Sequence, residues 1–426
     1  MSSLVALAKS AISAAIIPLG LIGLRPGRKL SPAWRVLLTV ALTLIVVFLV
    51  YHQLRVLAAK VHNPPQWDFL ALWLYGKATA MHLDIYRPGF AAQIAAPFHP
   101  DASFRREVID VGFVYPPTSI WLFLPLGWLG YHGAAALWAA VNLVILLADA
   151  YLLWRLFADG GRRDLLALLA AAAILFKLPA TPQTIDFLQS NFIALLAVLL
   201  LLKDRDNARG GLWLALAFMA KPFLGLMFVY ALLRRKWVAA LVGAGSLVLV
   251  AIGSWIVLGT QTMVTYVANS PYSRQPSWVF TEKTNQSLLA TILRATRWAG
   301  EYPPTHNPVY LALSAALIAV TVALILRARD RDDWAFALAL LVGLLVYPGT
   351  QFFYSDLLII PALMLWNLSR PSTIASAAVL VFITAEFIAI AQTPAAVFVA
   401  TAANWCIFAV MAAAWPRAAV AQLEPE

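Results

Sequence analysis

Long apolar segments without charged residues constrain this chain more than any other feature of its sequence. Residues 237–258 and 307–326 each match the roughly 20 apolar residues that an α-helix needs to cross a bilayer. Of all 426 residues, 62% are hydrophobic and only 12% are charged, whereas a soluble domain has about 25% charged residues. Because a water-soluble fold could not bury this much apolar surface, we predict an all-α polytopic membrane protein.

The spacing of the apolar segments predicts a bundle of about 12 transmembrane helices with short interfacial or re-entrant helices. Some candidates are shorter than a full span: at about 1.5 Å per residue, 210–220 covers only about half of a ~30 Å hydrocarbon core. Such helices end inside protein or at a water-filled cavity, because lipid cannot satisfy a free backbone. The candidate spans are 33–54, 134–156, 165–178, 190–202, 210–220, 222–233, 237–258, 307–326, 334–347, 355–368, 372–391 and 395–415.

Lys and Arg residues gather in the short loops between these segments, as in Arg234-Arg235-Lys236. Basic loops remain on the cytoplasmic side of a membrane, so we interpret the net charge of +11 as a topological signal and expect no nucleic-acid partner. The loops predicted to be cytoplasmic are 25–35, 155–164, 203–209, 234–236, 327–333 and Arg370.

Alternation of the spans places the remaining loops outside, including two large external loops, 55–133 and 259–306. Within the first of these loops, 116–130 is apolar but contains Pro125. If it crossed the membrane, Arg162 and Arg163 would face outside, so we predict an outer-leaflet or re-entrant helix instead.

The chain divides into a short N-terminal part, one transmembrane domain and a tail. Residues 1–32 are expected to hold an interfacial helix, over 1–24, and a basic cytoplasmic segment; a further span over 1–24 is the alternative. Residues 33–415 form the single transmembrane domain, and 416–426 a cytoplasmic tail. The one cysteine, Cys406, can form no internal disulfide.

Asp68 is the first candidate for chemistry, because it follows the predicted outer end of the first span by a few residues. A carboxylate at that boundary can take a proton from a hydroxyl nucleophile, as a general base does. Asp is also a common helix N-cap, and capping of the helix that follows is the alternative explanation.

Lys221 is the second candidate, since it lies in an apolar region with no charge between Arg209 and Arg234. Ionisable groups within the membrane are costly and usually face a cavity or a partner. Pro222 permits a break in the helix at this point, where an ammonium could bind a phosphate. The alternative is a lysine whose chain extends to the membrane surface.

Other polar side chains occur at the outer ends of spans, on the side predicted for Asp68. This convergence favours one external site, because unrelated polar residues would scatter over both faces. The side chains are Asp186, Gln189, Asn191, Asn285, Gln286, Ser287, Tyr354 and Asp356. Asp149 and Glu386, in contrast, lie within apolar segments and could serve as a proton relay or an ion site.

No metal-binding or nucleotide-binding motif is present in the sequence. The six histidines show no ligand spacing such as His-Glu-x-x-His, and there is no Walker pattern or glycine-rich phosphate loop. We therefore predict no specific metal site and no coupling to ATP. Loop carboxylates could still bind a divalent cation, which no motif specifies.

Several motifs, in this order, resemble glycosyltransferase family 87, a group of C-type membrane glycosyltransferases. The early acidic-aromatic motif is similar to Asp68-Phe69, Trp73 and Asp84-Ile85-Tyr86, and a Tyr-Pro-Pro element to Tyr115-Pro116-Pro117. A Gly-Gln-x-Asn element is similar to Gln189-Ser190-Asn191. The later elements resemble Gly210-Gly211, Lys221-Pro222, Arg234-Arg235-Lys236-Trp237, Asn285-Gln286-Ser287 and Tyr354-Ser355-Asp356-Leu357.

The resemblance covers roughly residues 65–370 and implies the C-type glycosyltransferase fold and a sugar transfer. The sugar, of mannose or arabinofuranose type, would pass from a polyprenyl-phosphate carrier to a glycan or glycolipid acceptor, with inversion. The implied location is the bacterial inner membrane, with the active site on the periplasmic side.

The resemblance also implies roles for individual residues. Asp68 would be the general base, and Lys221, Arg274 and Arg294 would bind the phosphate of the donor. The residues implied in binding the donor or the acceptor are Asp84, Tyr86, Tyr115, Gln189, Asn191, Asn285, Gln286, Tyr354 and Asp356.

Two other classes of function remain open at this point. A transporter or lipid flippase could use Lys221, Asp149 and Glu386 to line a pathway, in which case polar groups should be accessible from both sides. A non-catalytic partner of a membrane assembly is the third hypothesis. A transferase, in contrast, needs one external cavity.

Overall fold

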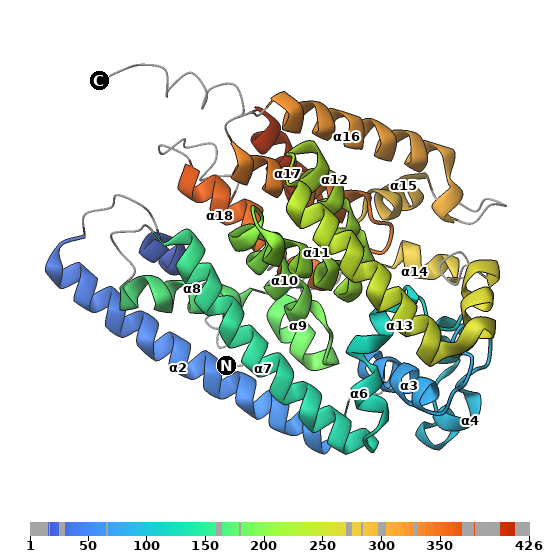
Figure 1. Cartoon of the computed structure of the whole chain (residues 1–426). Coiled ribbons are helices and arrows are strands. Elements are labelled where there is room, and N and C mark those ends of the chain that lie inside the picture. The colour runs from blue at the N-terminus through green and yellow to red at the C-terminus, as the bar shows by residue number, and fades with distance from the viewer. Residues whose placement is uncertain are drawn as a thin grey trace.

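The computed structural model of the chain is all-α over the residues that it describes, and its only β feature there is an isolated antiparallel bridge between Asn285 and Gln351. The helices are packed as a bundle whose long members run diagonally in Figure 1. The residues described are 16, 18–24, 30–64, 67–158, 164–178, 180–269, 275–282, 284–296, 304–327, 331–368, 379 and 401–413.

Four described helices are long and apolar enough to cross a membrane on their own. A fifth span results if α8 and α9, which meet at a 60° bend, count as one. The four helices are α2 (Pro32–His62), α7 (Tyr131–Phe157), α13 (Trp237–Asn269) and α16 (Pro308–Arg327), and the bent pair is α8 (Leu165–Lys177) and α9 (Ala180–Phe187).

The remaining helices are shorter, and several coincide with the short spans expected from the sequence. They are α3 (Asp68–Ala80), α4 (Ala92–Ala95), α5 (Ala102–Phe104), α6 (Leu124–Gly127), α10 (Asn191–Asp204), α11 (Ala208–Ala220), α12 (Leu226–Leu233), α14 (Ser277–Thr281), α15 (Leu288–Thr296), α17 (Asp332–Val346) and α18 (Ile359–Leu368), with a further helix over 401–413. Single turns of 3₁₀-helix or π-helix are η1 (Ala96–Phe98), η2 (Arg105–Ile109), η3 (Pro117–Leu122), η4 (Pro222–Gly225), η6 (Pro304–His306) and η7 (Phe352–Tyr354). The number of about 12 spans stays a prediction.

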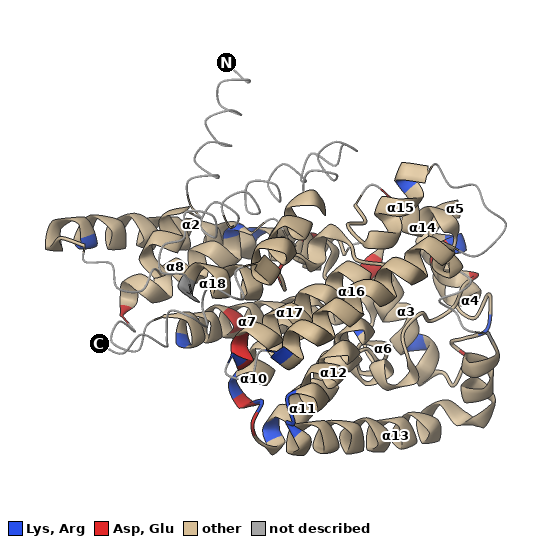
Figure 2. Cartoon of the chain, turned by 90° about the horizontal axis from the view of Figure 1, so that it is seen from above, with Lys and Arg blue, Asp and Glu red and all other residues tan. Residues whose placement is uncertain are grey.

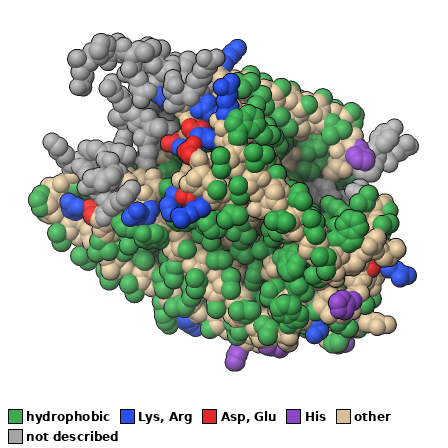
Figure 3. All heavy atoms as spheres, in the orientation of Figure 1, with side chains coloured by type: hydrophobic (Ala, Val, Ile, Leu, Met, Phe, Trp, Pro, Cys, Tyr) green, Lys and Arg blue, Asp and Glu red, His purple; other side chains and the backbone are tan. Residues whose placement is uncertain are grey.

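Apolar side chains point outward from the peripheral helices. Leu44 and Phe48 on α2 are more than 60% exposed, as are Leu241 and Ile256 on α13. Figure 3 shows hydrophobic side chains over most of one face of the molecule, with charged residues gathered at one end. Exposed apolar surface of this extent is stable in lipid and not in water, so the chain is an integral membrane protein.

The centre of the bundle is formed by α10 and α17. Every residue of α17 from Trp334 to Val346 is buried, as are most residues of α10. In Figure 1 α2 and α16 lie at opposite edges of the bundle with α10 and α17 between them, and in Figure 2 α13 lies along another edge. The continuous apolar sequence of α10 and α17 therefore reflects burial against protein on all sides.

Ion pairs join three of the loops predicted to be cytoplasmic. The carboxylate of Asp332 lies 2.7 Å from Arg205, 2.9 Å from Arg234 and 2.9 Å from Lys236. Figure 2 shows acidic and basic residues gathered where the ends of α10, α11 and α13 meet. The loops 203–209, 234–236 and 327–333 thus share one end of the bundle, here called the inner end.

Contacts at the opposite end, here called the outer end, join loops that were predicted to be external. The Lys60 ammonium lies 3.3 Å from the Asp186 carboxylate. The backbone N–H of Gln286 donates a hydrogen bond to the backbone carbonyl of Thr350 at 2.7 Å. The alternation of loops deduced from the basic residues is therefore consistent with the packing of the described helices.

Two boundaries differ from those expected from the sequence. α2 continues to His62 instead of ending near residue 54, because basic residues mark where lipid ends and do not by themselves stop a helix. The first part of the predicted loop 259–306 is helical. Gly259, at φ 80°, bends α13, and the helix resumes after it and ends at Asn269. Glycine adopts this left-handed backbone without a steric penalty.

The apolar segment 116–130 forms no spanning helix. It folds as η3 and α6, which are six and four residues long, and Trp121 donates a hydrogen bond to Ser254 of α13 at 3.0 Å. The segment therefore packs against the apolar part of α13, as a re-entrant element would.

At the N-terminal side, residues 18–24 are helical, and the carbonyl of Leu21 accepts a hydrogen bond from Trp366 at 3.0 Å. The assignment of 1–24 as an interfacial helix stays a prediction. Several other expectations lie outside the described residues: the span 372–391, the loop residues Arg162, Arg163 and Arg370, and the tail 416–426.

Candidate active site

Asp68 is the first residue of α3, and the N-cap position belongs to Trp67. Capping is therefore not the role of Asp68. Its carboxylate lies where the side chain of Gln189 and the charge of Lys221 both act on it electrostatically. Burial raises the pKa of Asp68 above its ordinary value, and the side chain of Gln189 and the charge of Lys221 partly offset this rise.

Lys221 occupies the break between α11 and η4, where its extended backbone and Pro222 interrupt the helix. Its side chain is only 2% exposed. The ammonium lies 3.5 Å from the Tyr115 hydroxyl and 3.4 Å from the Tyr354 hydroxyl, and 4.4 Å from the centre of the Tyr354 ring.

Two carboxylates interact with this ammonium, Asp68 from the outer side and Asp356 from the turn before α18. Asp356 is fully buried. The structure thus brings Asp68 and Lys221, which are far apart in the sequence, into one electrostatic unit. In chemical terms, a carboxylate near an ammonium can accept a proton while the ammonium stabilises a negative charge.

The motif Asp84-Ile85-Tyr86 holds the backbone at Tyr115, one of the tyrosines next to Lys221. The Asp84 carboxylate accepts hydrogen bonds from the Tyr86 amide at 3.1 Å and from the Thr265 hydroxyl at 2.7 Å. The buried Tyr86 donates its hydroxyl to the carbonyl of Tyr115 at 3.0 Å. These contacts hold Tyr115 beside Lys221 and connect the first outer loop to the bent end of α13.

Asn191 and Asn285 use their side-chain amides within the protein. Asn191 donates to Thr184 at 3.0 Å and to the carbonyl of Phe353 at 3.1 Å, and Asn285 donates to the carbonyl of Pro348 at 2.8 Å. Both side chains are buried. They therefore fix the segment 348–354, which carries Tyr354.

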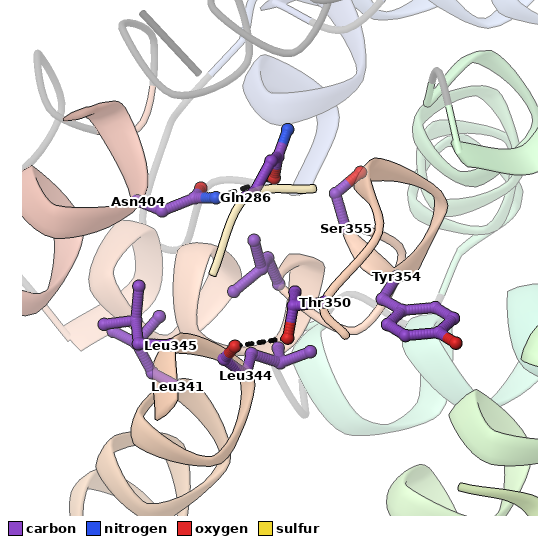
Figure 4. A pocket seen from close by; sticks show the side chains of 9 residues that line it. Gln286, Leu341, Leu344, Leu345, Thr350, Tyr354, Ser355 and Asn404 are labelled. Carbon is purple, nitrogen blue, oxygen red and sulfur yellow. Dashed lines mark hydrogen bonds between the residues drawn. The ribbon is translucent and has the colours of Figure 1, made fainter. Parts of the chain in front are cut away.

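Gln286 lies in a small cavity with Asn404, Thr350 and Ser355 (Figure 4). Its side-chain oxygen accepts a hydrogen bond from Asn404 at 2.9 Å. In Figure 4 the ring of Tyr354 points away from Gln286 and Asn404. The cavity therefore lies on the other side of the 350–355 turn from the Lys221 contact, and sugar binding by Gln286 stays a prediction.

Of the two arginines expected to bind phosphate, only Arg294 is among the described residues. Arg294 donates to the backbone carbonyls of Glu282 at 3.0 Å and Asn285 at 2.8 Å, which ties α15 to its own loop. Arg274 lies outside the described residues. Phosphate binding by either arginine stays a prediction.

Glu107 was not expected at the site from the sequence. It lies in the π-helical turn η2, and it interacts with Asp68 and with Glu282 of the second outer loop. Burial and these two neighbouring carboxylates raise the pKa of Glu107 to about 8. No sequence signal identified Glu107, because its environment comes from two distant segments.

Metal binding remains an expectation only. Within the described ranges, no group of three or more His, Cys, Asp or Glu side chains could hold a metal ion. A divalent cation bound by loop carboxylates stays a prediction.

Comparison with known protein families identifies the family of this chain. A sequence model of glycosyltransferase family 87 matches residues 113–361, more than half of the chain, and the chain belongs to this family. Among curated proteins, it is similar to alpha-(1->3)-arabinofuranosyltransferases.

One such enzyme, from Mycobacterium tuberculosis (strain CDC 1551 / Oshkosh), is 30% identical over 175 residues, which are 39% of each chain. Another, from Corynebacterium glutamicum, is 26% identical over 266 residues, 59% of this chain and 60% of the relative. The chain thus spans less than two thirds of the length of these relatives. No solved structure matches it.

Proposed function

We propose that the protein is an inverting glycosyltransferase that uses a polyprenyl-phosphate sugar as donor. The acceptor is a glycan or glycolipid on the non-cytoplasmic side of the membrane. The observation that carries this proposal is that the charges of Asp68 and Lys221 lie near enough to interact in a member of family 87. The relatives favour an arabinofuranose-type sugar over mannose.

In the proposed reaction, an acceptor hydroxyl oxygen forms a bond to the anomeric carbon while the bond from that carbon to the phosphate oxygen breaks. The proton of the hydroxyl passes to the Asp68 carboxylate, and the electron pair leaves with the phosphate. Lys221, supported by Tyr115 and Tyr354, stabilises the negative charge that develops there. Attack opposite the leaving group inverts the anomeric carbon.

A lipid-linked donor suits a site of this kind in two ways. Lys221 lies at the break between α11 and η4 of a membrane protein, and the apolar chain of a lipid carrier is soluble in the same bilayer. The sequence has no nucleotide-binding motif, and a polyprenyl-phosphate sugar requires none. The positive inner loops support an active site facing the periplasm.

The transporter or flippase alternative is not favoured. Asp149 is fully buried on α7 and interacts with Asp356, but Lys221 is already engaged by Tyr115 and Tyr354. Glu386, the third residue of the pathway, lies outside the described residues. Family membership also supports a transferase.

The direct test supplies membranes with radiolabelled polyprenyl-phosphate arabinofuranose and an acceptor glycolipid. We expect transfer by the wild type and a loss of about 10²-fold to 10⁴-fold in Asp68→Asn, as for removal of a general base. Asp101→Asn is the matched control, because Asp101 caps α5 and Asn can also cap. Wild-type activity with nucleotide sugars alone would refute the proposed donor.

Sidedness is tested separately by labelling single cysteines at positions 68, 221 and 286 with a membrane-impermeant reagent. The proposal expects labelling from outside at any of these positions that the reagent can reach. Labelling of position 221 from the cytoplasm would support transport instead.

A further inference from the structure

An apolar groove separates α12, α16 and α17, which lie side by side in the bundle (Figure 1). Its lining residues recur at every third or fourth position of α12 and α16, so each of these helices turns one continuous face towards the groove. The lining residues are Leu226, Val229, Tyr230 and Leu233 of α12, Ile318, Thr321, Val322 and Ile325 of α16, and Ala339 and Val342 of α17.

The groove opens at the surface that lipid covers. Val229 lines it and is 38% exposed, and the neighbouring Leu232 is 47% exposed. The cavity within the groove measures about 30 Å³, which leaves no room for another helix, since a helix with its side chains is about 10 Å across. In a bilayer, part of a lipid chain therefore fills the groove, because lipid tails are as apolar as leucine.

One end of the groove lies at the inner end of the bundle. Arg234, which directly follows Leu233, donates from its guanidinium to the carbonyl of Ile325 at 3.5 Å. The last lining residues of α12 and α16 are therefore close together there. Tyr230, one turn earlier on α12, is buried, and its hydroxyl makes no hydrogen bond with another described residue. This hydroxyl is available to donate to an oxygen atom of a ligand in the groove.

The inner end carries positive charge that the protein itself does not balance within its described part. Three cations pair there with three carboxylates, namely Arg205, Arg234 and Lys236 with Asp206, Asp332 and Asp333. Arg235, two residues after Leu233, and Arg327, the last residue of α16, are exposed and form no ion pair with any described residue. An anion can therefore bind at this end of the groove without competing with a carboxylate for these two arginines.

Arg235 has a conformation that is costly for a residue with a side chain. α12 ends in a Schellman motif, in which the Lys236 N–H donates to the Ala231 carbonyl at 2.8 Å and the Arg235 N–H to the Leu232 carbonyl at 3.1 Å. Arg235 occupies the position of this motif that is usually glycine, and its φ is 56°. Such strain is concentrated at functional sites, so an arginine in place of glycine indicates a role for its side chain.

We propose that the groove binds an anionic phospholipid, with one acyl chain between α12 and α16 and its phosphate held by Arg235 and Arg327. Basic pockets between transmembrane helices bind anionic headgroups in this way. The inference does not depend on the proposed sugar transfer, because the site is formed by residues other than Asp68, Lys221 and their partners.

A simpler explanation is that these arginines only mark the cytoplasmic side of the membrane, or that Arg235 interacts favourably with the dipole of α12. Both effects need a positive charge and no bound lipid. Arg209 is the matched control, because it is exposed in the loop 203–209, forms no ion pair with a described residue and does not line the groove.

The test is native mass spectrometry of the purified, delipidated full-length protein, titrated with phosphatidylglycerol or with phosphatidylcholine of the same acyl chains. We expect the wild type to bind one phosphatidylglycerol roughly fivefold to 30-fold more tightly than phosphatidylcholine, since two basic residues contribute to its binding. This preference should fall below about threefold in Arg235→Gln/Arg327→Gln and stay at its wild-type value in Arg209→Gln. Equal binding of the two lipids by the wild type, or an equal loss in Arg209→Gln, overturns the proposal.

A second pair of variants tests the position of the acyl chain. Val229→Trp places a large ring at the open edge of the groove, whereas Val320→Trp places it on an exposed part of α16 outside the groove. Val229→Trp should weaken the binding of both lipids by at least about fivefold, as expected where a bulky ring excludes a lipid chain. Val320→Trp should bind both as the wild type does. Unchanged binding in Val229→Trp contradicts the proposal, and so does a dimer of the wild type that Val229→Trp alone abolishes, because a second copy of the chain would then occupy the groove.

Arg235→Gly separates the charge of Arg235 from its strained backbone. Glycine adopts a φ near 56° without a steric penalty, so the delipidated variant should unfold at a higher temperature than the wild type. The same variant should lose part of the preference for phosphatidylglycerol, as Arg235→Gln does. A full preference in Arg235→Gly would exclude Arg235 from the headgroup site and overturn the proposal.

Discussion

The Lys221 ammonium lies 4.4 Å from the centre of the Tyr354 ring and 3.4 Å from its hydroxyl oxygen. Both the aromatic face and the hydroxyl of Tyr354 therefore contact the buried ammonium of Lys221. It comes from the turn η7, which the Asn191 and Asn285 side chains hold in place. The contact makes Tyr354 the residue best placed to orient the proposed phosphate ligand.

Replacement of Tyr354 should separate these two interactions. Tyr354→Phe keeps the ring and loses the hydroxyl, so the KM for the lipid donor should rise about twofold to tenfold. Tyr354→Leu also loses the cation–π contact and should raise the KM more than about tenfold. The measurement is the initial rate of transfer against donor concentration.

Tyr310→Phe is the control for these variants. Tyr310 is also buried and donates its hydroxyl to a backbone carbonyl, that of Val346 at 2.6 Å, but it does not contact Lys221. Its donor KM should equal that of the wild type. A wild-type KM in Tyr354→Leu would remove Tyr354 from the phosphate site.

Glu107 predicts an unusual dependence of stability on pH. The pKa of its carboxyl is raised from about 4.5 to about 8, so the folded state binds the proton more tightly than the unfolded state does. Glu107 therefore destabilises the fold progressively as the pH rises from about 4.5 to about 8. Glu107→Gln, which cannot ionise, should unfold at a higher temperature than the wild type at pH 8 and at the same temperature near pH 4.

The check is a series of thermal unfolding curves of the purified protein across this pH range. Asp101→Asn serves as the comparison, because Asp101 lies exposed in the same loop and accepts a hydrogen bond from the Phe104 backbone N–H, which Asn can also accept. A constant difference between Glu107→Gln and the wild type at every pH would exclude titration of Glu107 as the cause.

The crossing of α3 and α6 predicts a site that tolerates no side chain. A Cβ added at Gly127 would lie 2.1 Å from the backbone oxygen of Gly76, and backbone cannot move aside cheaply. Gly127→Ala should lower the free energy of unfolding by about 1–3 kcal/mol. Gly133→Ala, whose nearest neighbour lies at 3.9 Å, should instead stabilise α7 by about 0.5–1 kcal/mol. Thermal unfolding measures both, and equal effects would contradict the close approach.

The ion pairs at the inner end should contribute unequally. The Asp332 side chain is 19% exposed and pairs with three cations, whereas that of Asp333 is 55% exposed and pairs with Arg205. Asp332→Asn should lower the free energy of unfolding by about 1–3 kcal/mol, and Asp333→Asn by less than about 1 kcal/mol. Denaturation curves of the two variants test this order, and a larger effect at Asp333 would reverse it.

Much of the architecture could be predicted because lipid imposes simple rules on a sequence. Apolar segments indicated helices, and the basic loops 203–209, 234–236 and 327–333 were grouped together, as the Asp332 ion pairs join them; the side of the membrane stays a prediction. The failures occurred where those rules end. The apolar segment ends near residue 54 but α2 continues to His62, because hydropathy does not determine where a helix ends. The helical residues after Gly259 likewise lie beyond the apolar segment.

The site was predictable only in part. Asp68 and Lys221 could be singled out because charges are rare in such a sequence and each lies in its own family motif. The partners of the side-chain amides were not identifiable, because they depend on the segment that packs opposite: Asn191 and Asn285 meet the backbone carbonyls of Phe353 and Pro348.

The pairing of Asp68 with Lys221 also describes the ideal competitor for this protein. A small zwitterion, with a protonated amine on a ring and a phosphonate beside it, would satisfy the carboxylate and the ammonium together. A neutral compound of the same shape would desolvate the carboxylate and the ammonium without supplying the charges that compensate for the lost hydration. Inhibitor design should therefore begin from ring nitrogens joined to anionic tails.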